Sequence, residues 1–187
     1  MKSPHYFVVR PYNGRRYDNI RKYGDNEFII SSSQEDHTVT NRVGVVDSVP
    51  LGYDGSIKPG DHIVVHHNVF RLYYDMKGRE RSSWNHYKED IFIVEMDQVF
   101  LYRDPNGEWQ SPYPFCFVSP IDKDNEFGVS YDNSAYKILF GKIEYIPSNI
   151  VLNKGDIVSF QPESEYEFRI DDKLMYRIKI RNLCLRI

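Results

Sequence analysis

Short runs of apolar residues, separated by polar turns, dominate the chain and predict β-strands. In the first half these runs are rich in Val, Ile, Tyr and Phe: HYFVVR, RVGVVDSV, HIVVHH, FRLYY, DIFIVEM and VFLYR. The second half continues with FCFVS, AYKILFGKIEYI, DIVSF, YEFRI, LMYRIKI and LCLRI. No segment keeps the i, i+3, i+4, i+7 apolar spacing of a long amphipathic helix. The pattern therefore predicts an all-β protein, built as a small barrel or sandwich.

The same order of segments occurs twice, which predicts two tandem units. The clearest repeat is KPGDHIVVH, which contains Gly60-Asp61, and NKGDIVSF, which contains Gly155-Asp156 95 positions later. Around it, YFVVRP matches FCFVSP, RVGVVDSVP matches LFGKIEYIP, and MDQVFLYR matches IRNLCLRI. The second of these matches aligns Gly44 with Gly141. An internal repeat of this kind indicates that each copy is a structural unit.

The matching segments also set the expected boundaries of the two units. We expect a first unit over 1–103, a linker over 104–114 and a shorter second unit over 115–187, because the linker DPNGEWQSPYP is rich in Pro, Gly and Ser. The extra length of the first unit lies in a polar connection over 11–41 and in an extended hairpin over 76–90. A connection as long as 11–41 exceeds the roughly 12–15 residues that are usual for a structureless loop, so we expect it to be functional or disordered.

Composition and charge exclude several classes of protein. The 41% apolar and 15% aromatic content is typical of a globular protein. A net charge of −3 argues against a nucleic-acid-binding protein that relies on a strong positive field. No apolar run approaches the roughly 20 residues of a membrane span, and the start of the chain has too short an apolar stretch for a signal peptide, so we expect a cytoplasmic protein. Cys116 and Cys184 lie in strand-like runs and are predicted to be reduced core residues.

Motifs for catalysis, cofactors and metals are missing, which predicts a protein that is not an enzyme. There is no Walker phosphate loop and no G-x-G-x-x-G after a strand. Ser31–Ser33 and His37 share one polar loop without a nucleophile elbow. On a strand, His66 and His67 would point to opposite faces, and His62 and His66 have no further ligand at suitable spacing, so no metal site is expected.

The ordered set of segments resembles the GroES co-chaperonin family. The first copy carries it in FVVRP, VGVV, KPGDHIVVH and DQVFLYR, and the second in FCFVSP, FGKIEYIP, NKGDIVSF, FRIDDKLMYRIKI and RNLCLRI. Two features depart from the family. Its glycine-rich stretch is replaced by DSVPLGYDGS and EYIPSN, and its closing Asp-Ile-Leu appears as Gln98-Val99-Phe100 and Asn182-Leu183-Cys184. The resemblance, which spans nearly the whole chain, implies an all-β fold of two tandem small GroES-like β-barrels.

The resemblance also implies a function and a site. GroES-like proteins cap the folding cage of a chaperonin and insert a short hydrophobic segment of a mobile loop into the chaperonin's apical domains. In this chain the mobile loop corresponds to 11–41, and the hydrophobic segment to Phe28, Ile29 and Ile30, which lie between polar flanks. A few apolar anchors carry most of the energy in this kind of recognition. The alternative is that EFIIS forms an extra strand packed on the barrel, with its isoleucines in the core.

The expected partners follow from the same resemblance. They are a chaperonin ring, an unfolded client protein inside the cage and further copies of this chain, with a heptamer favoured; a virus-encoded chain acting in a host cytoplasm is compatible with this. The alternative function is a tandem β-barrel binding module for nucleic acid or a protein assembly. Arginines and tyrosines alternate in YNGRRYDNIRKYG, but Asp18 and Asp25 dilute the positive charge. For the hairpin over 76–90 we favour a solvated turn, and a contact surface built on Trp84 and Tyr87 is the alternative.

Overall fold

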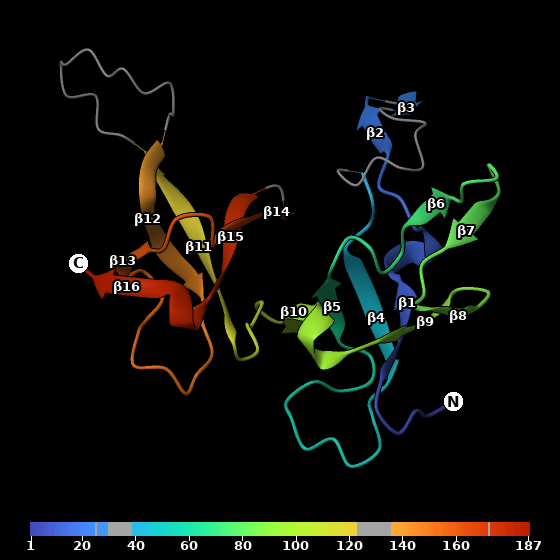
Figure 1. Cartoon of the computed structure of the whole chain (residues 1–187), viewed down its shortest axis with the longest axis horizontal. Coiled ribbons are helices and arrows are strands. Elements are labelled where there is room, and N and C mark those ends of the chain that lie inside the picture. Colours follow the sequence, from blue (N-terminus) through green and yellow to red (C-terminus); the bar gives the residue numbers. More distant parts are fainter. Residues whose placement is uncertain (25, 30–38, 123–135, 172) are drawn as a thin grey trace. The chain divides into compact units, whose positions relative to one another are not determined.

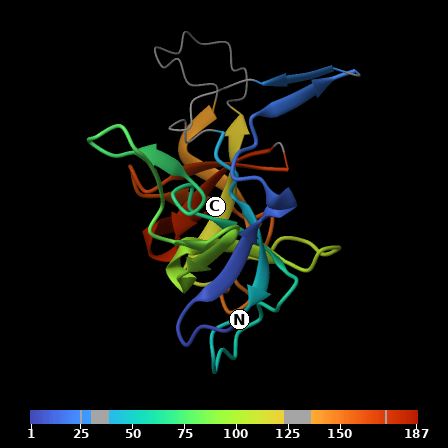
Figure 2. The same cartoon turned by 90° about the vertical axis from the view of Figure 1, so that its right-hand side faces the viewer.

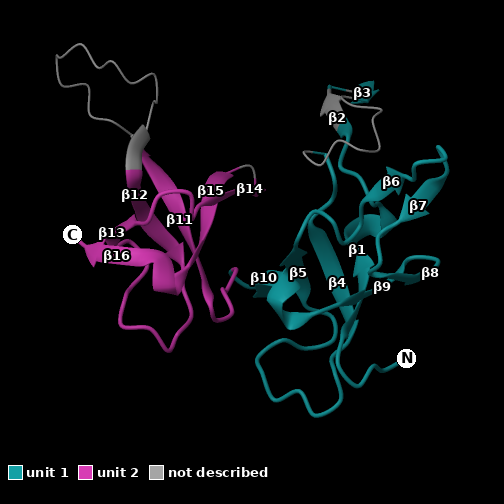
Figure 3. Ribbon diagram, in the orientation of Figure 1, with its two compact units in different colours: residues 1–108 teal, residues 109–187 magenta. Residues whose placement is uncertain are grey.

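The computed structural model describes residues 1–24, 26–29, 39–122, 136–171 and 173–187, and within them the protein is all-β. It divides into two compact units, residues 1–108 and 109–187 (Figure 3). Their boundary lies inside the segment over 104–114 that the sequence suggests as a linker. The second unit begins at Trp109, six residues before the position expected. Trp109 is buried, and its indole Nε1–H donates a hydrogen bond of 2.9 Å to Asp171 Oδ2.

Strands in the first unit are short, as the apolar runs predict (Figure 1). They are β1 (Phe7–Pro11), β2 (Ile20–Tyr23), β3 (Asn26–Ile29), β4 (Val43–Ser48), β5 (His62–Val65), β6 (Leu72–Tyr74), β7 (Glu80–Ser82), β8 (His86–Lys88), β9 (Ile91–Val94) and β10 (Val99–Arg103). Two 3₁₀ helices join them, η1 (Tyr12–Gly14) and η2 (Met96–Gln98).

The second unit repeats this series with fewer strands. It contains β11 (Phe115–Asp122), β12 (Tyr136–Tyr145), β13 (Ile157–Phe160), β14 (Tyr166–Ile170), β15 (Lys173–Lys179), η3 (Ile180–Asn182) and β16 (Leu183–Arg186). Its six-stranded sheet has the order β16-β13-β12-β11-β15-β14, and that of the first unit is β10-β5-β4-β1-β9-β8. All neighbours in both sheets are antiparallel. The two sheets therefore have the same topology, position by position.

Packing explains why a glycine recurs at the same position of β4 and β12. Gly44 pairs with Pro11, and Gly141 pairs with Pro120. A Cβ atom at Gly44 would lie 2.5 Å from Val9 Cγ1, and one at Gly141 would lie 2.5 Å from Val118 Cγ2. Real atoms do not approach so closely, so each sheet needs a residue without a side chain at this point.

The repeated Gly-Asp element forms the same turn twice. Gly60 and Gly155 have φ angles of 95° and 96°, a conformation that favours glycine. Gly60 N–H donates to Val46 O at 2.7 Å, and Gly155 N–H donates to Ile143 O at 2.8 Å. The aspartate next to each glycine closes the turn by accepting a backbone hydrogen bond three residues upstream, at 2.8 Å for Asp61 and 2.9 Å for Asp156.

Each unit has its own core, made by the inward side of its sheet. The cluster of the first unit contains Phe7, Val9, Val46, Ile57, Ile63, Val65, Val69, Phe70, Phe92, Val94 and Val99. That of the second unit contains Cys116, Val118, Ile143, Val158, Phe160 and Ile178. Among the described residues, no helix is long and apolar enough to cross a lipid bilayer.

The two cysteines differ, which corrects the expectation that both lie in the core. Cys116 is buried, and Cys184 is an exposed free thiol on β16. Neighbouring side chains of a strand point to opposite faces, and Leu183 packs against the core of the second unit. Cys184 therefore lies on the other face of this edge strand.

Candidate binding hairpin

The predicted loop over 11–41 contains a β-hairpin that belongs to neither six-stranded sheet. Within the residues that the structure describes, strands β2 and β3 pair only with each other, from Ile20 opposite Ile29 to Tyr23 opposite Asn26. Gly24 stands in the turn with a φ of 61°, which suits glycine. Figures 1 and 2 show the hairpin standing apart from the six-stranded sheet of its unit.

Two of the three predicted anchor residues are exposed on this hairpin. Phe28 is 52% exposed and Ile29 is 70% exposed, and Ile30 lies outside the described residues. Side chains at consecutive strand positions point to opposite faces, so both faces of the hairpin are accessible here. The alternative was that EFIIS forms an extra strand with its isoleucines in the core. The strand is present as β3, but Ile29 is not in the core, because β3 is exposed along its whole length.

The base of the hairpin is closed by backbone pairing between its two arms. Tyr17 and Thr40 form an isolated antiparallel bridge. On either side of it, Asp18 N–H donates to Val39 O at 2.8 Å, and Asn41 N–H donates to Arg16 O at 2.9 Å. Val39 and Thr40 are buried, so this end of the connection is part of the folded unit.

Asn41 fixes the chain where it returns to the sheet. Its side-chain Nδ2 donates to the carbonyl oxygens of Arg15 at 2.8 Å and Tyr12 at 3.2 Å, and its Oδ1 accepts from Val43 N–H at 2.9 Å. One amide side chain therefore holds both ends of the connection between β1 and β4.

Arg16 and Tyr17 join the base of the hairpin to neighbouring strands. Arg16 Nη1 donates to Ser82 Oγ at 2.8 Å, and its guanidinium lies 4.9 Å from the centre of the Phe92 ring. The Tyr17 hydroxyl accepts a hydrogen bond of 2.8 Å from Leu72 N–H. Burial lowers the pKa of Arg16 and raises the pKa of Tyr17, as expected for groups removed from water.

The central apolar residues of the corresponding connection in the second unit, Phe127 to Val129, lie outside the described residues, as do Ser31–Ser33 and His37 of the first unit.

The predicted hairpin over 76–90 consists of two successive turns. Its first part is the turn and second strand of the β6–β7 hairpin, which pairs Leu72 with Ser82 and Tyr74 with Glu80. Its second part is β8, which pairs with β9. Trp84 and Tyr87 are exposed, as both interpretations of this segment require.

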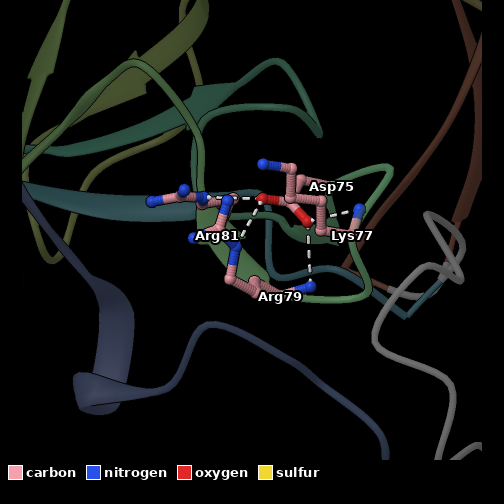
Figure 4. Close-up of polar contacts among 4 residues, drawn as sticks. All are labelled: Asp75, Lys77, Arg79 and Arg81. Atoms are coloured by element: carbon pink, nitrogen blue, oxygen red, sulfur yellow. Dashed lines mark hydrogen bonds and ion pairs between the residues drawn. The ribbon is translucent and has the colours of Figure 1, made fainter.

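Sequence reasoning overlooked a polar cluster in the turn of the β6–β7 hairpin. The Asp75 carboxylate accepts hydrogen bonds from the backbone N–H groups of Lys77 and Arg79, each at 2.9 Å, and from Nε of Arg79 and Arg81 at 3.2 and 3.3 Å (Figure 4). The signal was available in DMKGRER, where an Asp precedes a Lys-Gly turn and two alternating arginines.

The histidines do not form a metal site within the described residues. β5 ends at Val65, so His66 and His67 follow the strand rather than alternate along it. Their ring centres are 4.1 Å apart, which makes the prediction of opposite faces wrong. His62 packs edge-on against Tyr12, and burial followed by the charge of Arg103 lowers its pKa. No group of three or more metal-ligating side chains occurs in the part of the chain that the structure describes.

Comparisons with known proteins leave the family of the chain open. No protein-family model matches it, and no curated protein matches its sequence.

Proposed function

We propose that the protein is a cytoplasmic co-chaperonin, which caps a chaperonin cage and assists ATP-dependent folding of a client protein without being an enzyme itself. The observation that carries the proposal is the exposure of Phe28 and Ile29 on a hairpin outside the six-stranded sheet. Bulky apolar side chains exposed on both faces of a two-stranded hairpin suit a partner's groove, which would cover them on binding. The resemblance of the ordered segments to the GroES family indicates that this partner is a chaperonin.

The repeated unit supports the same proposal at the level of the fold. The two sheets have the same strand order, and the Gly-Asp turn lies at the same position in each. This is expected if the chain carries two copies of one ancestral unit. A fold does not fix a function, so the argument rests on the hairpin.

The energy available from one hairpin implies that several must act together. Burying the exposed parts of Phe28 and Ile29 would contribute roughly 2–4 kcal/mol. Association alone costs about 4 kcal/mol or more, so a single hairpin of this size binds weakly. Several hairpins on one oligomer gain affinity through their high effective concentration. We therefore include a homo-oligomer in the proposal, with a heptamer favoured because it would present seven hairpins in register.

A difference between the two edge strands supports an oligomer. β10 and β16 occupy the same position in their sheets, and the aligned residues are Leu101 and Leu185. Leu101 is fully buried, whereas Leu185 on β16 is 67% exposed, and Ile187, which follows β16, is also exposed. An exposed apolar edge strand invites pairing with another chain, and an oligomer would cover it.

A chaperonin pull-down in the presence and absence of ATP tests the proposal. We expect retention of the wild-type chain only with nucleotide, and loss of retention in the double variant Phe28→Ser/Ile29→Ser. The matched control is Leu51→Ser/Val151→Ser, which also removes two exposed apolar side chains but leaves the hairpin intact.

Two outcomes would overturn the proposal. One is that the wild-type chain is not retained by the chaperonin under any nucleotide condition. The other is that both double variants, each folded by circular dichroism, lose binding equally, because the hairpin would then have no special part.

A further inference from the structure

The turn of the β6–β7 hairpin holds two guanidinium groups on one carboxylate. Asp75 Oδ2 accepts from Nε of both Arg79 and Arg81, and Asp75 Oδ1 is held by backbone N–H groups (Figure 4). Both contacts are made through the Nε–H group of the arginine. The two side chains remain 60% and 51% exposed. A pair of guanidinium groups held in this way is pre-organised to bind an oxyanion.

An exposed aromatic ring belongs to the same face of the hairpin. Tyr73 is directly opposite Arg81 in the strand register and is exposed. Directly opposed residues share a face, and side chains two positions apart on one strand do as well. Tyr73, Asp75, Arg79 and Arg81 therefore lie on one face. Leu72 and Ser82 belong to the other, where Ser82 Oγ accepts a hydrogen bond from Arg16.

The local charge is opposite to that of the whole chain. Residues 71–88 contain five basic residues, Arg71, Lys77, Arg79, Arg81 and Lys88, against two acidic residues, Asp75 and Glu80. The segment is thus net positive in a chain with a net charge of −3. It also presents the exposed aromatic residues Tyr73, Tyr74, Trp84 and Tyr87. Positive charge combined with accessible aromatic rings is typical of surfaces that bind single-stranded nucleic acid.

We propose that this face of the β6–β7 hairpin binds single-stranded nucleic acid, with a backbone phosphate on Arg79 and Arg81 and a base stacked on Tyr73. An acidic peptide would also satisfy the guanidinium groups, but it would make no use of the exposed Tyr73 ring on their face. Base stacking does use this ring, and it tolerates any sequence because every base has a π-face. This activity goes beyond the proposed chaperonin function and uses a different hairpin.

Asp75 acts as a positioning residue in this arrangement. Its hydrogen bonds to the backbone N–H of Arg79, then of Lys77, and its contact with Arg81 lower the pKa of its carboxyl. The carboxylate therefore stays ionised at neutral pH and keeps both guanidinium groups in place.

Fluorescence anisotropy with a labelled oligo(dT) probe at low salt tests the proposal. We expect the wild-type chain to bind and Arg79→Ala/Arg81→Ala to bind about tenfold or more weakly, with a smaller salt dependence, since each phosphate contact on a single strand contributes about 0.7 to the logarithmic slope. The matched control is Arg10→Ala/Arg186→Ala. These two arginines are 58% and 55% exposed and are each paired with one aspartate.

A second pair of variants separates stacking from charge. Tyr73→Phe keeps the ring and should bind like the wild type, whereas Tyr73→Ala should weaken binding several-fold at unchanged salt dependence. Phe28→Ser/Ile29→Ser should leave probe binding unchanged. The nucleic-acid proposal is therefore tested independently of the chaperonin proposal.

Several results would overturn the proposal. They are no binding by the wild-type chain, an equal loss in the Arg10/Arg186 control, equal binding of a poly-Glu peptide at the same hairpin, and tighter binding of a duplex than of the single strand.

Discussion

At the scale of single residues, the close approach at the repeated glycines determines which substitutions the sheets tolerate. Gly44 and Gly141 have ordinary φ angles, so their requirement comes from packing alone. We expect Gly44→Ala and Gly141→Ala each to lower the free energy of unfolding by about 1–3 kcal/mol, as overpacked cores do. Urea unfolding measures this. Gly107→Ala is the control, because its nearest neighbour would be 3.3 Å away, and an effect as large there would contradict the packing argument.

The two thiols should differ sharply in reactivity. Burial raises the pKa of Cys116 to about 12, so its thiol stays protonated well above neutral pH. Cys184 is exposed. At pH 8 we expect a thiol reagent to modify Cys184 rapidly and Cys116 only after unfolding, because the thiolate is the reactive form. Mass spectrometry of Cys116→Ser and Cys184→Ser identifies the modified residue. Rapid modification of folded Cys184→Ser would contradict the structure.

At the scale of elements, the Asn41 side chain helps to hold the base of the β2–β3 hairpin. Asn41→Ala removes hydrogen bonds to Tyr12, Arg15 and Val43. Of these backbone groups, the Tyr12 carbonyl keeps its longer bond of 3.4 Å from Arg15 N–H. We expect a loss of about 1–2 kcal/mol in stability and faster hydrogen exchange at Val43. Asn149→Ala, at an exposed position, should have little effect. If Asn41→Ala leaves exchange at Val43 unchanged, the side chain does not hold this junction.

The turn of the β6–β7 hairpin should respond to acid through Asp75. A lowered pKa means that the folded state favours the carboxylate, so the contribution to stability is present above the ordinary value of 3.8 and is lost as the pH falls through the lower, folded value. An NMR titration of the Asp75 carboxyl should give a midpoint below 3.8, and Arg81→Ala should raise that midpoint. A midpoint at or above 3.8 in the wild-type chain would contradict the cluster.

At the scale of the whole molecule, the exposed strand β16 predicts assembly. We expect native mass spectrometry to find a homo-oligomer, with seven chains favoured. A trimer or tetramer would instead indicate a ring of alternating units. Leu185→Ser should dissociate the oligomer, because it makes the exposed edge polar. Val151→Ser, an exposed apolar residue outside the strands, is the control. A monomer at all workable concentrations would remove the basis for a capping ring.

The sequence by itself determined the all-β class, most strands of the two six-stranded sheets and the internal repeat. Strands follow from period-two patterns and from β-branched and aromatic residues, which act locally. The alignment of Gly44 with Gly141 and of Gly60 with Gly155 identifies equivalent positions in the two sheets, because a close contact and a positive φ each demand glycine. The apolar segment with Phe28 and Ile29 between polar flanks could also be read from the sequence, which left open whether it is exposed or packed on the barrel.

Only the tertiary structure decided which faces of those strands are covered. Because side chains alternate along a strand, the sequence indicates that Cys184 and Leu183 point to opposite faces of β16. Only the structure shows that Leu183 faces the core and that the face with Cys184 is exposed to solvent. The end of β5 at Val65, and with it the tilted contact between the rings of His66 and His67, depends on the turn that follows. The contacts of Arg79 and Arg81 with Asp75 likewise depend on the register of β6 with β7, and a local sequence pattern does not determine which residues pair across strands.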